Sequence, residues 1–508
     1  MSVNSWSDGY NHPHCPHTLL PVVPMICVSI AQESRRLALA DMLNAAMLGA
    51  DLVEVRLDRF EKDANLSELV AAKRTPVLFS CKRPEDGGQW EGTEDERLVL
   101  LRTAVISKAD YVEIELDAAD QIRPFPGCQR VVSYTNLAET PADIDGIYER
   151  ILTKKPDVVK LTCRAETPAD AWPLIQILNK PPVPTVVVGV GGAGVLLALL
   201  GRKIGAPWAS AALERGMEAY PGQPTVNDLA DLYAYRDIGK KTRFVGVTGT
   251  GERDRVAAAL LNAAFAHTNL PHRALPVGMG NRKLFRKIAD AVRLQGVLVD
   301  DENYEGLHEI ARLDESAVAP VLAADTLFPA DDGWTAVNTL GPAFVSALDA
   351  TLAARGSSLQ GRVVLLAGCG VATRMLAIPL KTRGAALIWA SKNRNAVQAT
   401  CQAFGGRQLL WEAIYSTSHD VLVVGRDGTG DEETTVHPGY LKPGMVVADA
   451  TAAEMTPLLR EAAERGCGIV RPTSVQVEQV RAFVARLGGE VPAEVLTAKL
   501  AGWRPDDA

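Results

Sequence analysis

Residues 51–58 read Asp51-Leu-Val-Glu-Val-Arg-Leu-Asp58, and this stretch decides the fold. Apolar residues surround Glu54, Arg56 and Asp58, so in a strand all three charged side chains project from one face. Three charges on one strand face are costly to bury unless they pair with one another or line a site. The stretch therefore predicts a strand that carries either a buried ion-pair network or a functional site, and both interpretations stay open.

A second stretch, Asp157-Val-Val-Lys160, ends a short β-branched run with a single lysine. A desolvated lysine amine can act as a Schiff-base nucleophile. The alternative is that Lys160 simply pairs with Glu54 in a protein core.

Around these two stretches, β-rich runs alternate with amphipathic helical segments such as 35–48 and 94–106. Eight β-rich runs with helical links in about 200 residues predict an α/β fold that begins with a (β/α)8 TIM barrel, over residues 24–238. Chemistry in that fold lies at the carboxyl ends of the strands, where Glu54, Arg56, Asp58 and Lys160 fall. The predicted strands are 25–30, 51–57, 76–81, 111–116, 130–134, 158–163, 185–190 and 208–213.

The second half predicts two further α/β units. Strand-like runs at 243–248, 272–277, 294–299 and 318–323 indicate one domain over residues 242–345. The run from Gly361 to Arg374 then reads as a buried strand, a Gly368-Cys-Gly370 turn and a helix start. This pattern predicts a Rossmann-like nucleotide domain over residues 356–508, with an empty or repurposed cleft as the alternative. Further strands are expected at 420–425, 445–448 and 468–470, and a helical tail at 475–487 that packs back on this domain.

Composition restricts the partners. The net charge of −8 argues against nucleic acid and anionic membranes, and no apolar run reaches membrane-spanning length. The eight cysteines form no CxxC pair, which is typical of reduced thiols in the cytoplasm. We expect residues 1–23 to form a flexible tail rather than a secretory signal. The sequence leaves open whether the protein is an oligomer.

These residues carry a family resemblance. Glu54-Val-Arg-Leu-Asp58 and Val158-Val-Lys160 resemble the signatures of type I 3-dehydroquinate dehydratase. The remainder of the chain is similar to shikimate dehydrogenase, so the whole resembles the bifunctional fusion of the two enzymes. For the barrel, the resemblance implies a small carboxylate substrate, no cofactor, and an imine between Lys160 and the substrate ketone.

The resemblance also implies roles for the residues around Lys160. Glu54 and Arg56 orient the base and the substrate ring, and Gln223 covers the substrate. Lys82 or Arg83 supplies positive charge, and the sequence does not decide which of the two does so.

The barrel departs from the family pattern at two positions. In Ser133-Tyr-Thr-Asn136, Thr135 occupies the place of the family's catalytic histidine, and no histidine lies between His17 and His267. Threonine has no pKa near neutrality, so it cannot replace a general base. Ala198 takes the place of the arginine that grips the substrate carboxylate, and Arg202 is one helical turn too far along to replace it.

The dehydrogenase half departs as well. Arg255 and Ala257 replace the family's serine pair, Tyr304 replaces its catalytic lysine, and Asn338 replaces its catalytic aspartate. Gln479 matches the substrate glutamine. Gly368, Gly370 and Arg374 match the cofactor loop, and Lys392 matches a residue that holds a 2′-phosphate, which favours NADP over NAD.

Two hypotheses follow. The first is a bifunctional shikimate-pathway enzyme with impaired activity and residual imine chemistry at Lys160. The second is a non-catalytic pseudoenzyme that keeps both folds to bind a metabolite or a nucleotide, or to act as a scaffold.

Overall fold

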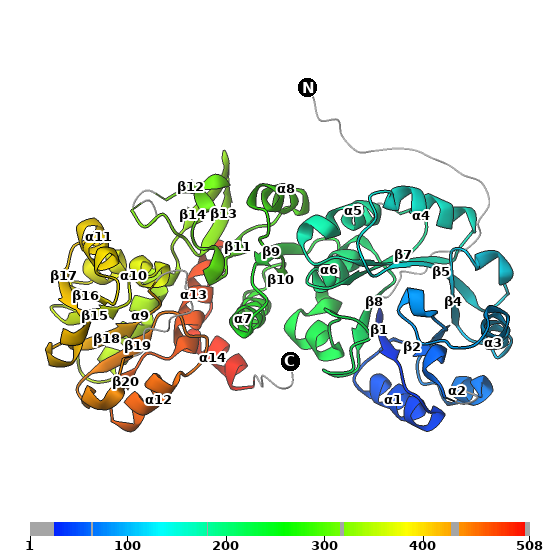
Figure 1. Ribbon diagram of the computed structural model, residues 1–508, viewed down its shortest axis with the longest axis horizontal. Helices are drawn as coiled ribbons and strands as arrows, with labels where there is room; N and C mark the ends of the chain where they lie inside the picture. The colour runs from blue at the N-terminus through cyan, green and yellow to red at the C-terminus, as the bar shows by residue number, and fades with distance from the viewer. Residues whose placement is uncertain (1–24, 62–64, 180, 315–319, 428–435, 503–508) are drawn as a thin grey trace.

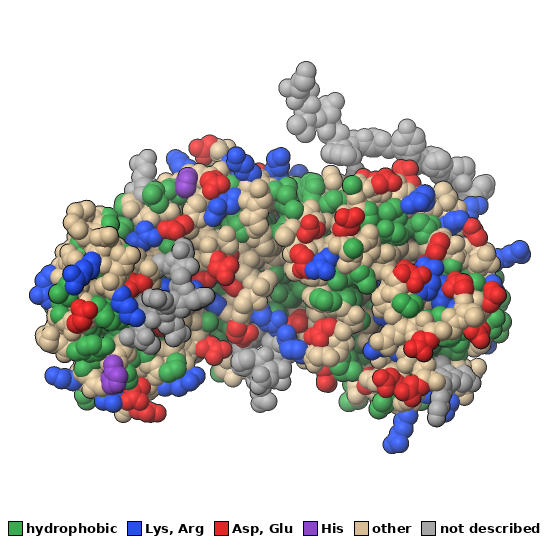
Figure 2. All heavy atoms as spheres, in the orientation of Figure 1, with side chains coloured by type: hydrophobic (Ala, Val, Ile, Leu, Met, Phe, Trp, Pro, Cys, Tyr) green, Lys and Arg blue, Asp and Glu red, His purple; other side chains and the backbone are tan. Residues whose placement is uncertain are grey.

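The computed structural model describes residues 25–61, 65–179, 181–314, 320–427 and 436–502. Three sheets follow one another along an elongated molecule, with the first at the right of Figure 1 and the third at the left. Acidic and basic side chains are interspersed over the face seen in Figure 2. The predicted flexible tail, residues 1–23, lies outside the described residues. None of the described helices is long and apolar enough to cross a membrane.

The first sheet confirms the predicted TIM barrel. Its eight strands lie in the order β7-β6-β5-β4-β3-β2-β1-β8, and each paired neighbour is parallel. The strands are buried on both faces, and such strands have near-continuous apolar sequences. They are β1 (Met25–Ile30), β2 (Leu52–Arg56), β3 (Val77–Ser80), β4 (Tyr111–Glu115), β5 (Gln129–Asn136), β6 (Val158–Arg164), β7 (Thr185–Val190) and β8 (Trp208–Ala212).

Six helices cover the barrel (Figure 1): α1 (Arg35–Met47), α2 (Leu66–Ala72), α3 (Glu94–Ile106), α4 (Ile144–Thr153), α5 (Pro168–Leu178) and α6 (Gly194–Ile204). Between β4 and β5 the chain forms only a short 3-10 helix, η3 (Ala119–Gln121). A regular (β/α)8 barrel has an α-helix between β4 and β5, so the flank of this barrel between α3 and α4 lacks one helix.

The barrel interior is layered. An apolar layer includes Cys27, Leu52 and Val158. Because side chains alternate along a strand, the residues two places further on point the same way and form the next layer toward the carboxyl end. In β1, β2 and β6 these residues are Ser29, Glu54 and Lys160, so the strand period itself brings polar groups together.

The second sheet is mixed, in the order β10-β9-β11-β13-β14-β12. Its strands are β9 (Arg243–Val247), β10 (His272–Pro276), β11 (Val297–Leu298), β12 (Arg312–Leu313), β13 (Thr326–Ala330) and β14 (Gly333–Val337), with helices α7 (Glu252–Thr268), α8 (Arg282–Val292) and α9 (Leu340–Ala353). The predicted strand at 318–323 is wrong in its described part. Residues 320–322 form a turn, and the strand begins at Thr326, paired in an antiparallel hairpin with β14.

The third sheet is parallel and Rossmann-like, in the order β17-β16-β15-β18-β19-β20. Its strands are β15 (Val363–Ala367), β16 (Ala386–Ser391), β17 (Arg407–Leu410), β18 (Val421–Val424), β19 (Val446–Asp449) and β20 (Gly468–Ile469), with helices α10 (Val371–Thr382), α11 (Arg394–Phe404) and α12 (Pro457–Glu464). Two helices end the chain, α13 (Pro472–Arg486) and α14 (Ala493–Ala501). The tail expected at 475–487 differs from expectation in its packing, because α13 packs on α9 and α7, and α14 packs on α7.

Candidate active site

A buried cluster of charges lies at the centre of the barrel. The Lys160 ammonium is 2.8 Å from a carboxylate oxygen of Glu113 and 3.3 Å from one of Glu54. The other oxygen of Glu113 lies 2.5 Å from the Lys82 ammonium. Glu113 therefore bridges two lysines, and all four side chains are less than 10% exposed.

Alternate strands of the barrel position three members of this cluster. Lys160 projects from β6, Glu113 from β4 and Glu54 from β2, while Lys82 follows the end of β3. Two serine hydroxyls donate to the Glu54 carboxylate, Ser80 at 2.7 Å and Ser29 at 3.3 Å. These bonds fix the carboxylate toward the barrel axis.

The cluster determines the protonation of Lys160. Burial alone lowers the pKa of a lysine, but the carboxylates of Glu113 and Glu54 more than offset this and raise the pKa of Lys160 above its usual value. Burial likewise acts to raise the pKa of Glu113, and the ammonium groups of Lys160 and Lys82 lower it well below its ordinary range. At neutral pH the site therefore contains charged ammonium and carboxylate groups.

Arg56 and Asp58 pair with each other instead of joining this cluster. The guanidinium donates two hydrogen bonds to the carboxylate, at 2.9 and 2.8 Å. The same carboxylate accepts the backbone N–H groups of Lys82 at 3.1 Å and Gln89 at 3.0 Å. Of the two interpretations of the opening stretch, the buried ion pair is confirmed for Arg56 and Asp58. Glu54 pairs with Lys160 beside a cavity, so a functional role for Glu54 stays a prediction.

A small cavity opens beside Lys160. Its volume is about 60 Å³, and Glu54, Arg56, Lys82, Thr135 and Lys160 are among the residues that line it. The Thr135 hydroxyl is buried without a hydrogen-bond partner in the described chain. A polar ligand in the cavity would supply that missing partner.

Gln223 is held at the edge of this site. Its carbonyl accepts the N–H of Ala219 at 2.7 Å, and its amide nitrogen donates to the Ser29 hydroxyl at 3.4 Å. The Ser29 hydroxyl in turn donates to Glu54, so two hydrogen bonds link Gln223 to the Glu54 carboxylate.

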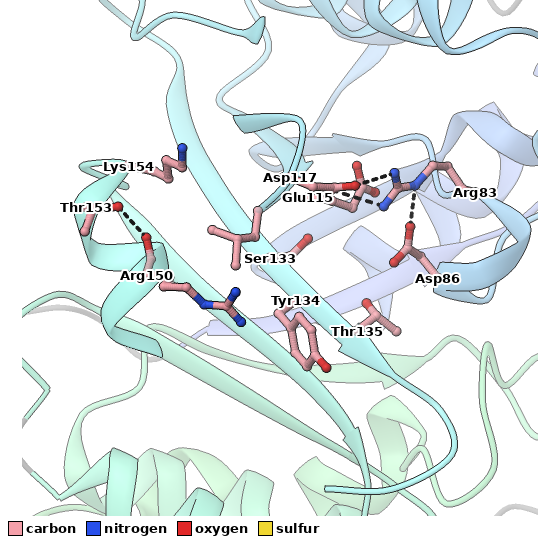
Figure 3. A pocket seen from close by; sticks show the side chains of 11 residues that line it. Arg83, Asp86, Glu115, Asp117, Ser133, Tyr134, Thr135, Arg150, Thr153 and Lys154 are labelled. Atoms are coloured by element: carbon pink, nitrogen blue, oxygen red, sulfur yellow. Dashed lines mark hydrogen bonds and ion pairs between the residues drawn. The ribbon is translucent and has the colours of Figure 1, made fainter. Parts of the chain in front are cut away.

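A larger cleft of about 530 Å³ adjoins the cavity on the flank that lacks a helix. Figure 3 shows Arg83 on one side of this cleft and Arg150 on the other, with Ser133, Tyr134 and Thr135 of β5 between them. Arg83 forms ion pairs there with Asp86 at 2.7 Å and Asp117 at 2.8 Å (Figure 3). Of the two basic candidates, Lys82 thus lies with Lys160 and Arg83 lies in the adjoining cleft.

Arg202 does not replace the arginine that is absent at Ala198. Arg202, one turn further along α6, lies over the Tyr235 ring at 5.9 Å. The Tyr235 hydroxyl donates to the carbonyl of Met25 at the amino end of β1, so Arg202 lies at the opposite end of the barrel from the Lys160 cavity.

In the second half, the residues predicted for catalysis and substrate binding are buried, and two of them are hydrogen-bonded to other residues of the chain. Tyr304 is 2% exposed, and burial raises the pKa of its phenol above the usual value. The Asn338 amide donates to the Met375 carbonyl at 2.8 Å and accepts the Gly341 N–H at 2.9 Å. Gln479 donates to the fully buried carboxylate of Asp325 at 2.6 Å.

The predicted cofactor residues surround the turn between β15 and α10. Gly368 has a φ of +114°, and Gly370 is the N-cap residue of α10. Arg374 forms an ion pair with Glu305 of the second domain at 2.6 Å, and the Lys392 ammonium lies over the Trp411 ring at 5.8 Å. The turn amide of Cys369 donates to the Asp427 carboxylate at 3.0 Å. A carboxylate on that amide does not fit a dinucleotide phosphate.

Sequence reasoning missed Glu113, although its signal was present. Residues 111–115 read Tyr111-Val-Glu-Ile-Glu115, so two carboxylates alternate with apolar residues as the charges do in residues 51–58. The same alternation predicts that Glu113 and Glu115 share one face of β4.

Known proteins match this architecture. Residues 26–240 match the family model described as Type I 3-dehydroquinase. A bifunctional 3-dehydroquinate dehydratase/shikimate dehydrogenase of Arabidopsis thaliana is 28% identical over 493 residues, which is 91% of this chain and 82% of that protein. A 3-dehydroquinate dehydratase of Methanopyrus kandleri is 33% identical over 197 residues, 37% of this chain and 89% of that protein.

Solved structures are similar as well. The dehydroquinate dehydratase and shikimate dehydrogenase of S. pombe AroM covers 94% of this chain and 98% of its own, with 18% identity and a TM-score of 0.43. Shikimate 5-dehydrogenase from Thermus thermophilus, in complex with NADP(H) and shikimate, covers 51% of this chain and 98% of its own, with 18% identity and a TM-score of 0.43.

Fold and site together define the class, a TIM barrel with a buried lysine at its centre that is fused to a two-sheet α/β half. The chain belongs to the type I 3-dehydroquinase family, in the bifunctional form that is fused to a shikimate dehydrogenase-like half.

Proposed function

We propose that the barrel binds a 3-dehydroquinate-like carboxylate and still forms an imine at Lys160, but lacks the base for fast dehydration. The observation that carries this proposal is the position of the Lys160 amine, 2.8 Å from a Glu113 carboxylate and on the wall of a cavity. A carboxylate at that distance can take and return the protons that imine formation requires.

The proposed step balances within this cluster. One proton must pass from Lys160 to Glu113 against the resting pKa values of the pair, and the neutral amine then adds to the ketone carbon of the ligand. The resulting carbinolamine hydroxyl takes the proton back from Glu113 and leaves as water. The products are a protonated imine on Lys160 and an ionised Glu113, which is the charge state in which the cluster began.

Dehydration requires a further base, and the described barrel residues place none in the expected position. Thr135 occupies the histidine position, and its hydroxyl has no pKa near neutrality. Glu54 is the nearest other carboxylate to Lys160, but Ser80 and Ser29 already donate to it. Loss of general-base assistance slows a reaction by about 10² to 10⁴.

We further propose that the shikimate dehydrogenase-like half is not a competent reductase. The raised pKa of Tyr304 keeps its phenol protonated at neutral pH, so it cannot exchange protons as a lysine–aspartate pair does. Lys392 favours NADP as the ligand of the third sheet, whereas the Asp427 contact opposes it. The division into domains at 24–238, 242–345 and 356–508 remains part of this proposal.

One observation favours the non-catalytic alternative. Lys160 is already neutralised by two carboxylates in a buried cluster, so it has a structural partner without any ligand. On this interpretation the barrel binds a small carboxylate or acts as a scaffold without covalent chemistry.

Borohydride trapping tests the proposal. The intact chain is incubated with 3-dehydroquinate and borohydride, and peptide mass spectrometry should find a reduced adduct on Lys160. Lys160→Met is the control that must lose the adduct. Lys82→Met, which removes the other ammonium from Glu113, should keep it. If no adduct forms while calorimetry still detects 3-dehydroquinate binding, the non-catalytic alternative is correct.

A further inference from the structure

The backbone amides of the Gly368–Gly370 turn are occupied by the protein's own acceptors. The Cys369 N–H donates to a carboxylate oxygen of Asp427 at 3.0 Å, and the Gly370 N–H donates to the Arg426 carbonyl at 2.8 Å. Both acceptors come from the segment that follows β18, the strand beside β15. In dinucleotide folds, amides of this turn and the helix behind it receive the pyrophosphate.

The same carboxylate also reaches the second strand of the fold. Its other oxygen accepts the backbone N–H of Lys392 at 3.2 Å, just beyond the end of β16. That strand end is where dinucleotide folds hold the ribose or its 2′-phosphate. One Asp427 side chain therefore spans the two positions that the anionic parts of NADP would occupy.

The backbone around the turn leaves little room for a phosphate beside the Asp427 carboxylate. A Cβ atom on Gly368 would come within 2.4 Å of the Gly425 carbonyl, so the turn and the β18 segment are in direct contact. The arginines that could compensate a phosphate are paired with the second domain: Arg374 with Glu305 at 2.6 Å, and Arg426 with Asp301 at 3.8 Å.

We propose that Asp427 is a built-in anion that occupies the phosphate positions of the dinucleotide cleft, so that NADP and NAD bind weakly until its charge is removed. The reason is electrostatic, because a carboxylate on the turn amides repels a diphosphate and takes its donors. This inference concerns the third sheet and does not depend on the chemistry proposed for Lys160.

Calorimetry with NADP and with NAD on the full chain tests it. We expect no saturable binding by the unaltered protein at about 1 mM nucleotide, the concentration that corresponds to very weak binding. Asp427→Asn and Asp427→Ala should each bind both nucleotides at least about tenfold more tightly, because a charged hydrogen bond typically shifts an equilibrium by about tenfold to a hundredfold. Glu461→Gln is the matched control, since it removes one charge from an exposed pair with Arg465 on α12.

Three results would overturn the proposal. One is micromolar binding of either nucleotide by the unaltered protein, a measurement that needs no variant to fold. Another is unchanged affinity in both Asp427 variants, whose folding is checked by circular dichroism. The last is a gain for NADP alone, which would make Asp427 a discriminator of the 2′-phosphate rather than an occupant of the cleft.

Discussion

Glu113 Oε2 lies 2.8 Å from Lys160 Nζ, and the other oxygen of the same carboxylate meets a second ammonium. Removing one partner of a buried ion pair leaves an uncompensated charge, which typically costs about 3 to 5 kcal/mol. Loss of Glu113 therefore removes a partner from two buried ammonium groups and leaves Lys160 with Glu54 alone.

We expect Glu113→Gln to lower the free energy of unfolding by about 3 kcal/mol at pH 7, as measured by urea denaturation. The pKa of Glu113 is lowered in the folded protein, so the stability it contributes is present above the ordinary glutamate pKa, about 4.3. It is lost as the pH falls toward the folded pKa. The difference between the two proteins should thus be largest at neutral pH and shrink below about pH 4.

Glu68→Gln is the control, because Glu68 forms an exposed pair with Arg35 and should change stability by less than about 1 kcal/mol. An equal difference between wild type and Glu113→Gln at neutral pH and at about pH 3.5 would contradict the assigned charge state.

Thr135→His should restore a general base beside the Lys160 cavity. Thr135 already lines that cavity with a partnerless hydroxyl, so an imidazole there replaces no existing hydrogen bond of the described chain. We expect 3-dehydroquinate dehydration to rise by about 10² or more, followed by the absorbance of the enone product. Adding Ala198→Arg should lower KM, whereas Ala198→Arg alone should leave kcat low. No gain in the double variant would refute the idea that these two losses limit the rate.

Gln479→Ala tests whether that side chain is structural. Its amide donates to Asp325, whose carboxylate is fully buried, and loss of a hydrogen bond to a charged group costs about 1.5 to 3 kcal/mol. We expect urea denaturation to show a free energy of unfolding that is lower by this amount. Gln476→Ala, one turn earlier on α13, removes a bond to the Arg253 carbonyl and should cost about 1 kcal/mol. A stability of Gln479→Ala equal to wild type would favour a ligand-binding role instead.

Asp254→Asn should stabilise the protein at alkaline pH. Burial and the nearby Asp300 raise the pKa of Asp254 to about 6 in the folded protein. The folded state therefore holds an extra proton between the ordinary aspartate pKa, about 3.9, and that value, so stability falls as the pH rises through this window. We expect the variant to gain about 1 to 3 kcal/mol over wild type at about pH 8 and little at about pH 4. Asp349→Asn, at an exposed pair with Arg383, should give no such trend.

Much of the barrel could be predicted because its strands are periodic. Side chains two residues apart share a face, and parallel pairing sets Ser133 beside Lys160 in register. Two stretches about a hundred residues apart, which carry Glu54 and Lys160, therefore meet at one layer of the barrel.

The remaining contacts depend on tertiary structure. Arg56 turns back to Asp58 because the backbone amides of Lys82 and Gln89 hold that carboxylate, and these amides belong to a later loop. Asp427 reaches an amide 58 residues earlier in the chain, from the segment after a neighbouring strand. Neither contact has a local periodicity, so the sequence pattern could predict the turn but not its occupant.

The bridge formed by Glu113 has a consequence for how such chains diverge. Lys160 and Lys82 neutralise the same buried carboxylate, and Lys160 also pairs with Glu54, so a mutation that removes the charge of any one of these residues penalises folding. Selection for a folded chain is then sufficient to retain the lysine after its reaction has been lost. Among relatives of this barrel, a retained lysine therefore indicates an intact charge cluster in the interior. Whether such a barrel turns over substrate must be judged from the proton-transfer groups around the lysine.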